Sequence, residues 1–370
     1  MIVSITFNLL LAVTLMFSSA VLYIGNTIGQ KDDTYYDFED EYATEMDEEN
    51  LGKMIIQNYY LKEIIKDSHS FKSGQSPEKD NGVTVAPFNQ INNNKIAFIM
   101  PTFTMAAYDN SFYPFYKKYV TVTTREAEDA FVTTDLHLLS SQVPDREKAF
   151  LHYKSNGIKH LADRISFLSP NMEVSFLTDT DVHNALLFDN NDQNLYKFII
   201  LAHQEYVTEE EYDNFKKFVE NGGILILLDS NVFYAEVAYD PINQQTTLVQ
   251  GHHWAFDGEK AWRDVKERWA EETTQWVGSN YGCGSSCSID FNNNPFSYVH
   301  HEEQYVTNPN ARILIDYQAQ SKFNYLIAAY ELEYGNGNVI SFGIFGDDVI
   351  SNKDFIQFFD DLFLLHVSLV

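Results

Sequence analysis

Two segments of the chain carry polar side chains of the types that move protons or bind ligands. The sequence HQEY occupies residues 203–206 and directly follows an apolar run at residues 198–202. The sequence DSNVFY occupies residues 229–234 and follows a second apolar run at residues 224–228. Histidine and acidic side chains are common carriers of protons in active sites. These two segments are therefore the best candidates for a functional site.

The two apolar runs predict neighbouring strands that are joined by a helix. Each run is too short for a helix and is typical of a strand buried on both faces of a parallel sheet. Between the runs, Thr208 and Glu211 form a capping-box pattern, apolar residues recur at helical spacing, and Gly222 ends the helix. A right-handed crossover makes the two strands parallel, so their carboxyl ends open on the same edge of the sheet. Open α/β sheets bind their ligands at that edge.

The composition excludes one class of function. The formal net charge is −28 over 370 residues. A protein that binds nucleic acid needs Lys and Arg to displace counterions from phosphates, so we expect no nucleic-acid partner. The only two cysteines, Cys283 and Cys287, predict a local disulfide in an exported protein. A zinc site would need two further ligands; His252–His253 and His300–His301 could supply them, but neither pair has the spacing of a zinc finger.

The N-terminal part of the chain predicts export and membrane attachment. Residues 1–24 are almost wholly apolar and long enough to span a bilayer, so we expect a single transmembrane anchor, with a cleaved signal peptide as the alternative. Residues 31–50 form an acidic stalk, and residues 51–94 form an amphipathic helix and a linker. The predicted location is the cell membrane with the body outside the cytoplasm, or secretion if the signal is cleaved.

The remaining residues, 95–370, form the predicted α/β body. Its fold class is a doubly wound open sheet, mostly parallel, with a long insertion at residues 240–310 near the C-terminal third. The insertion holds all four tryptophans, and Trp262, Trp269 and Trp276 are seven residues apart. This spacing predicts one helix whose aromatic stripe packs on the body. An exposed aromatic platform for a sugar or a partner is the alternative.

The order of elements in the body resembles the flavodoxin-like fold of class I glutamine amidotransferases. The late sequence GNGNVISFGIF at residues 335–345 is similar to the hairpin strand near the end of that fold. In that family a cysteine nucleophile and a histidine follow two of the strands. The matching positions here are near Ser230 and Gly346, so we expect no glutamine amidotransferase activity. The resemblance extends to the trehalose-utilisation-like branch of the same fold.

The segments HQEY, Gly222-Gly223 and NVFY resemble the C-terminal domain of the N,N-dimethylformamidase large subunit more narrowly. In that family two such segments each present a tyrosine to an iron ion, and a later glutamate completes the site. The resemblance implies Tyr206 and Tyr234 as ligands, together with Glu302 or Glu303, and iron as the cofactor. The base nearest to these ligands in the sequence is Glu205 or His203, so we expect one of them to be the catalytic group that moves a proton. Gln204 and Ser230 stand where that family has Pro and Gly.

Two functions of different class follow from these observations. The first is an extracytoplasmic, metal-dependent hydrolase that acts on small amides or related C–N bonds. The alternative is a non-catalytic binding or accessory subunit of a membrane-associated complex. The partner is a small molecule in the first case and a protein of that complex in the second.

Overall fold

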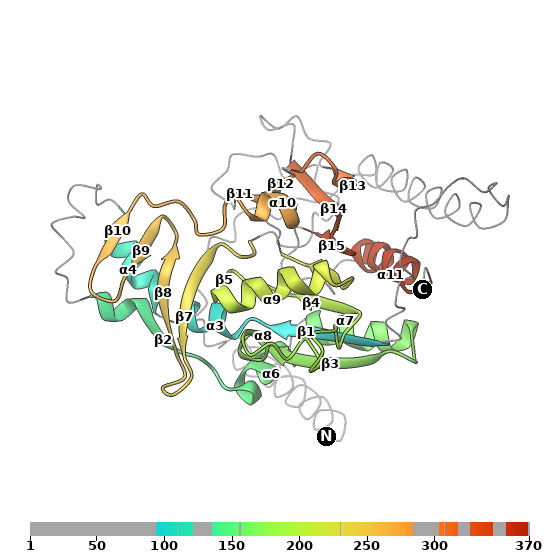
Figure 1. Ribbon diagram of the computed structural model, residues 1–370, viewed down its shortest axis with the longest axis horizontal. Helices are drawn as coiled ribbons and strands as arrows, with labels where there is room; N and C mark the ends of the chain where they lie inside the picture. The colour runs from blue at the N-terminus through green and yellow to red at the C-terminus, as the bar shows by residue number, and fades with distance from the viewer. Residues whose placement is uncertain are drawn as a thin grey trace, which may run out of the picture. The chain divides into compact units, whose positions relative to one another are not determined.

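The computed structural model describes the part of the chain from residue 94 onward, with gaps. The described ranges are 94–109, 111–120, 135–154, 157–229, 231–283, 303–306, 308–316, 326–342 and 353–368. These residues form a mixed α/β structure with two multistranded sheets (Figure 1). The predicted anchor, stalk, amphipathic helix and linker lie outside the described residues. Among the helices that the structure describes, none combines the length and apolarity needed to cross a bilayer.

The first sheet contains a block of parallel strands and a block of antiparallel strands. The parallel strands, in spatial order, are β3 (Glu173–Thr178), β1 (Lys95–Met100), β4 (Phe198–Leu201), β6 (Ile224–Leu227) and β15 (Gly337–Ser341). The antiparallel strands are β14 (Leu326–Tyr334), β12 (Glu303–Val306), β11 (Ser279–Cys283) and β13 (Arg312–Asp316). The prediction of a mostly parallel sheet is therefore wrong, because the turn before β15 makes a hairpin that reverses the chain direction.

Helices bury both faces of the parallel block. Phe98 and Ile200 pack in one cluster with α6 (Arg146–Lys154), α7 (Gly157–Leu168) and α11 (Lys353–Ser368). Ile99 and Leu201 pack in a second cluster with α8 (Asp179–His183) and α9 (Glu209–Glu220). Successive residues of a strand point to opposite faces, so a strand that is buried on both faces must be continuously apolar. This explains why the apolar runs at residues 198–202 and 224–228 are strands.

The predicted strand–helix–strand unit is confirmed. β4 and β6 are adjacent and parallel, with Phe198 opposite Ile224. Thr208 caps α9, since its Oγ1 accepts a hydrogen bond from the Glu211 backbone N–H at 3.2 Å. The N–H of Gly223 bonds the Phe218 carbonyl where the helix ends.

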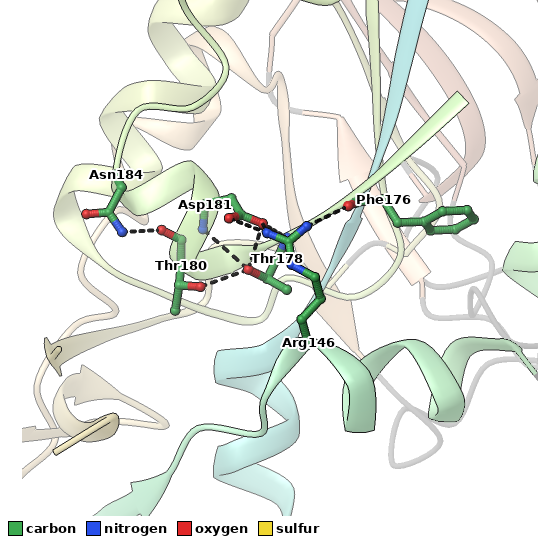
Figure 2. A network of polar contacts seen from close by, with 6 residues as sticks. All are labelled: Arg146, Phe176, Thr178, Thr180, Asp181 and Asn184. Carbon is green, nitrogen blue, oxygen red and sulfur yellow. Dashed lines mark hydrogen bonds and ion pairs between the residues drawn. The ribbon is translucent and has the colours of Figure 1, made fainter. Parts of the chain in front are cut away.

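A network of polar contacts fixes the start of α8 after β3 (Figure 2). The Arg146 guanidinium of α6 donates to both carboxylate oxygens of Asp181, at 2.6 and 2.5 Å, and to the Phe176 carbonyl at 3.2 Å. Thr178 and Asp181 form a reciprocal capping box. This arrangement anchors the helix at Asp181, and Asp179, the first residue of the helix, is wholly buried.

The insertion forms a second sheet and not the predicted helix. The insertion contributes β8 (Gln245–Gly251), β9 (Trp254–Phe256) and β10 (Ala261–Arg263). Earlier parts of the chain contribute β7 (Ala235–Asp240), β5 (Tyr206–Val207) and β2 (Ser140–Gln142). Figure 1 shows β7–β10 gathered beside α4 (Phe112–Tyr119). A turn at Gly258, which has a φ of +91°, separates β9 from β10, so this part of the insertion is a hairpin and not a helix.

The tryptophans of the insertion lie in different elements, so the helical stripe is wrong. Trp262 is in β10 and 37% exposed, whereas Trp276 ends the short helix α10 (Thr273–Trp276) and is buried. Two of them nevertheless pack on the body as expected. The ring of Trp269 stacks on Tyr212 of α9 at 4.3 Å, and Trp276 Nε1 donates to the Tyr212 hydroxyl at 2.8 Å. Before β2, the chain forms the 3₁₀ helix η1 (Leu136–Leu139).

The β14–β15 hairpin packs so tightly on the end of α9 that Gly337 tolerates no side chain. A Cβ there would lie 2.2 Å from the Gly223 carbonyl oxygen and 2.4 Å from that of Val219. Both are backbone atoms, so we expect Gly337→Ala to lower the free energy of unfolding by about 3 kcal/mol. Gly258→Ala is the control, because its Cβ would meet nothing within 4 Å and only its positive φ opposes alanine. We expect that variant to lose about 1 kcal/mol in denaturant titrations. Equal losses would contradict the packing argument.

Candidate functional site

Both segments that the sequence singled out lie where the chain passes from the first sheet to the second. β4 continues through residues 202–205 into β5, and β6 continues through residues 228–234 into β7. β5 and β7 again pair in parallel, with Tyr206 opposite Ala235. Between the sheets, the N–H groups of Phe233 and Tyr234 donate to the carbonyls of Gln204 and Glu205 at 2.8 and 3.0 Å. The two segments are therefore held against each other at both ends.

The carboxylate of Glu205 is the centre of a buried polar cluster. Its Oε2 accepts a hydrogen bond from the Tyr108 hydroxyl at 2.5 Å and lies 3.4 Å from His203 Nε2. Its Oε1 is 2.6 Å from His252 Nε2. The other ring nitrogen of His203, Nδ1, bonds the Asp229 carboxylate, which is also wholly buried. The ring of His203 thus bridges two carboxylates that come from neighbouring strand ends.

The charges of this cluster follow from its contacts. Burial opposes ionisation of Glu205, but His252 and His203 lower the pKa of its carboxyl to about 2. Burial also opposes protonation of His203, but Asp229 and Glu205 together raise the pKa of its imidazole well above the usual value. At neutral pH, Glu205 is therefore an anion that can accept a proton, and His203 is a cation that can donate one.

A cluster of tyrosines surrounds the imidazole of His252. The ring of Tyr116 stacks on it at 4.7 Å, and the wholly buried ring of Tyr206 stacks at 5.6 Å. Tyr113 and Tyr234 meet the imidazole edge-on at 5.8 and 5.1 Å. Tyr113 and Tyr116 come from α4, which follows α3 (Thr102–Tyr108) and its terminal Tyr108.

Two phenol oxygens of this cluster are buried without a hydrogen bond of normal geometry. They are the Oη atoms of Tyr116 and Tyr206. The two groups lie close enough to affect each other's ionisation, and burial raises the pKa of both phenols well above the usual value. Buried polar atoms normally have a partner, so an unmatched pair marks a place where a ligand could supply one.

A glutamate of the insertion completes the cluster. Glu267 lies within hydrogen-bonding reach of Tyr234 and close enough to His252 for an electrostatic interaction. Its Oε1 accepts a hydrogen bond from the His253 N–H at 2.8 Å. Burial raises the pKa of this carboxyl above the usual value. Glu267 was not among the residues predicted from the sequence.

The structure brings four of the six predicted site residues together. His203, Glu205, Tyr206 and Tyr234 all contact the cluster around His252. Glu302 lies outside the described residues. Glu303 begins β12 in the first sheet, opposite Cys283, and its side chain is not among those described. The disulfide stays a prediction, because Cys287 lies outside the described residues.

Several members of the cluster gave only weak signals in the sequence. The aromatic-rich stretch at residues 108–119 suggests a covering element, and it supplies Tyr108, Tyr113 and Tyr116. His252 belongs to a histidine pair, which the sequence offers only as a source of zinc ligands. In the structure its Nε2 bonds Glu205.

Comparison with known proteins identifies the family of the chain. The family model for N,N-dimethylformamidase beta subunit-like, C-terminal domains matches residues 71–327, which is more than half of the chain. The chain belongs to this family. The resemblance of the sequence to dimethylformamidase is confirmed. It points to the large subunit, however, whereas the family description names the beta subunit. No curated protein sequence matches the chain significantly.

Solved structures add only distant likenesses. A putative ThuA-like protein from Bacteroides uniformis is 12% identical, with a TM-score of 0.34, over 79% of this chain and 95% of its own. A GH42 β-galactosidase from G. stearothermophilus is 14% identical, with a TM-score of 0.33, over 72% of this chain. The chain spans about 30% of the length of that β-galactosidase. At these TM-scores neither likeness bears on the activity.

The donor atoms of the cluster decide which metal would fit it. In the part of the chain that the structure describes, no group of three or more His, Cys, Asp or Glu side chains is arranged to hold a metal ion. A metal would therefore need phenol oxygens as ligands. Tyr206, whose buried Oη makes no normal hydrogen bond, and Tyr234 contact the same imidazole, and Glu267 lies beside Tyr234. These three residues supply such a set of hard oxygen donors. Hard oxygen ligands suit ferric iron, so the residues present fit the cofactor implied by the family resemblance.

Proposed function

We propose that this chain is a metal-dependent hydrolase of small amides or related C–N bonds, with a function related to that of N,N-dimethylformamidase. One observation carries the proposal. Two tyrosines from the ends of β4 and β6 gather with Glu267 around one imidazole, and the ionised carboxylate of Glu205 lies beside them. Membership of the dimethylformamidase-like family supports the same conclusion.

The proposed iron ligands are Tyr206, Tyr234 and Glu267. Glu267 takes the place of Glu302 or Glu303, because its carboxyl adjoins Tyr234. Bound there, ferric iron would act as a Lewis acid that polarises an amide carbonyl. The phenols are protonated in the absence of a cation, so binding would release protons as the ligand oxygens ionise.

The remaining residues would move protons and hold their neighbours in place. Hydrolysis joins the oxygen of water to the carbonyl carbon, breaks the C–N bond and transfers a proton to the leaving nitrogen. Glu205 is the group that would accept the proton of the attacking water and pass it to the amine. His203, bonded to Asp229, would orient Glu205 and balance its charge. Glu205 is a weak base at its low pKa, so its position must contribute more than its basicity.

Metal analysis tests the proposal directly. Protein purified without chelators and incubated with ferric iron should bind one equivalent and absorb visible light, since iron–phenolate pairs have a charge-transfer band. Tyr206→Phe should weaken iron binding strongly and reduce the band, because it removes one of the two phenolate oxygens and keeps the ring. Tyr212→Phe is the matched control: this buried tyrosine on α9 bonds Trp276 and lies outside the cluster. It should keep the band and lose about 1 kcal/mol of stability.

The choice of glutamate is tested by a second pair of variants. Glu267→Gln should weaken iron binding strongly, whereas Glu303→Gln should not. The reverse result would restore the ligand first expected from the sequence. If the wild-type protein stays colourless and free of metal, the proposed hydrolase function is wrong. That result would leave the alternative of a binding or accessory subunit in a membrane-associated complex.

We also propose a finer fold class and a location. The parallel strands have the order β3-β1-β4-β6-β15, which supports a doubly wound flavodoxin-like core, and helices cover both of its faces. Residues 1–24 would anchor the chain in the cell membrane with the body outside the cytoplasm. The apolar composition of that segment supports this, and protease protection of membrane vesicles would test it.

A further inference from the structure

The turn that carries His252 has a backbone conformation that histidine rarely adopts. Gly251 pairs with Trp254 across the β8–β9 hairpin, so His252 and His253 form a two-residue loop. Their φ angles are +51° and +64°. Two-residue hairpin loops with positive φ at both positions strongly favour Asn-Gly, because other side chains crowd the backbone there. Strain of this kind persists only where the rest of the structure requires it, and it concentrates at functional sites.

The two histidines of this turn have opposite surroundings. The side chain of His253 is 68% exposed, and its backbone N–H is the group that bonds Glu267. The side chain of His252 is 25% exposed and packs against the rings of Tyr116 and Tyr206, with its Nε2 on Glu205. The His253 imidazole has a longer contact, 3.8 Å from its Nδ1 to Glu267 Oε1. The close contacts of an imidazole therefore account for the residue at position 252 more than for the one at position 253.

The position of the imidazole bears on every group of the proposed site. It touches the two proposed ligand tyrosines, Tyr206 on its face and Tyr234 on its edge. It also supplies the shortest contact of Glu205 Oε1. Removing the ring would leave a gap beside Tyr116, Tyr206 and Tyr234 and would free one oxygen of Glu205.

We propose that His252 is the positioning residue of this site: its imidazole sets the separation of Tyr206 and Tyr234 and fixes the orientation of Glu205. The inference rests on the proposed function for what the site does, but not for the contacts themselves. The strained turn delivers the ring between the two sheets, and the ring then holds together groups from β4, β6 and α4. A hairpin with Asn-Gly at the turn would be easier to form and would leave the site without its central contact.

Chemical rescue in metal-free protein tests the inference. His252→Gly relieves the positive φ but removes the ring. We expect it to lower Tm by several degrees and to alter the tyrosine signals of the near-ultraviolet circular dichroism spectrum. Free imidazole should fill the gap, raise Tm again and restore those signals, because a ligand stabilises the state that binds it. The experiment is done with a chelator present, so that imidazole cannot act through a metal.

His253→Gly is the matched control, since it changes the same residue type in the same turn at an exposed position. It should keep or gain stability and should not respond to imidazole, and neither should the wild type. If His252→Gly is as stable as His253→Gly and does not respond to imidazole, His252 has no positioning role. A general structural role would lower Tm without rescue by imidazole, and that result would also overturn the inference.

Iron binding provides the second readout. His252→Phe keeps a ring beside the tyrosines but loses the bond to Glu205 and the shape of the imidazole. It should bind ferric iron 10–100-fold more weakly than the wild type, as loss of a group that orients ligands does, and its charge-transfer band should shift. Unchanged affinity and an unchanged band would overturn the inference. If the wild type binds no iron, the proposed function fails, and the rescue by imidazole alone decides the role of His252.

Discussion

Replacing Glu211 with glutamine should make the protein more stable above neutral pH. The carboxyl groups of Asp179 and Glu211 are wholly buried and adjoin each other between α8 and α9. Asp179 Oδ2 accepts hydrogen bonds from the Phe103 N–H at 2.7 Å and from Thr102, and its Oδ1 faces Gln204 Nε2. Two adjoining carboxylates cannot both ionise at low cost in such a place, so the pair must retain a proton.

The direction of the pH dependence follows from the raised pKa values. Burial raises the pKa of Asp179 to about 7, and burial together with Asp179 raises the pKa of Glu211 well above its usual value. When the pKa of an acid is higher in the folded state than in the unfolded state, the acid contributes fully to stability below the pKa of the unfolded state. This contribution is lost as the pH rises through the folded pKa. The wild type should therefore lose stability steadily between about pH 4 and pH 8.

Glu211→Gln removes one titrating group and keeps an amide that can donate to Asp179. Each pH unit of proton uptake is worth about 1.4 kcal/mol, so the variant should gain on the order of 2–4 kcal/mol over the wild type at pH 8. At pH 5 the two should be nearly equal. Denaturant titrations at both pH values measure the difference. Glu210→Gln, on the same helix but with an exposed side chain, should run parallel to the wild type. A uniform effect of Glu211→Gln at all pH values would contradict the shared proton.

The second large effect should come from His203→Ala. This change leaves the carboxylates of Asp229 and Glu205 buried without the cation that lies between them. Breaking a buried ion pair costs about 3–5 kcal/mol, because the remaining charge has lost its compensation. His183→Ala is a suitable control, since that half-buried imidazole bonds only a neutral hydroxyl, Thr208 Oγ1, at 2.9 Å, with Glu210 3.6 Å away. Its loss should be about 1 kcal/mol.

A double variant separates the charge of His203 from its volume. Adding Asp229→Asn to His203→Ala removes one uncompensated charge, so the double variant should be more stable than the sum of the single losses predicts. The pKa of His203 is raised, so its contribution is complete below about pH 6.5 and is lost as the pH rises through the folded value. The difference between wild type and His203→Ala should therefore shrink at alkaline pH. Additive losses that are independent of pH would show that only the volume of the ring matters.

The parts of the fold that the sequence predicted are those with strong local signals. The apolar runs of β4 and β6, the cap at Thr208 and the stop at Gly222 each act over a few residues, so they can be read without knowledge of the rest of the chain. The parallel direction of β4 and β6 can also be predicted, because crossover geometry leaves few alternatives. The placement of Tyr206 and Tyr234 around one imidazole follows from the same two strands.

The second sheet could not be predicted in this way, because its pairings are remote. Ser140 of β2 pairs with Thr247 of β8, and nothing in either segment indicates the other. The seven-residue spacing of Trp262, Trp269 and Trp276 resembles a helix but spans a strand, a turn and a short helix. Glu267 lies in the sequence KERW, whose charges are typical of a solvated surface. Its role becomes visible only when the β8–β9 turn brings it to Tyr234.

The passage of two strands from one sheet to the other has a consequence for how related sequences can vary. Residues 202–205 and 228–234 are anchored on both sides by parallel pairing, in register β4 with β6 and then β5 with β7. One inserted or deleted residue would turn the side chains of the following strand to the opposite face, and Tyr206 would leave the cluster. The exposed turn at residues 241–244 has no such constraint. Relatives that keep the site should therefore differ in length at that turn, while these two connections keep a constant number of residues.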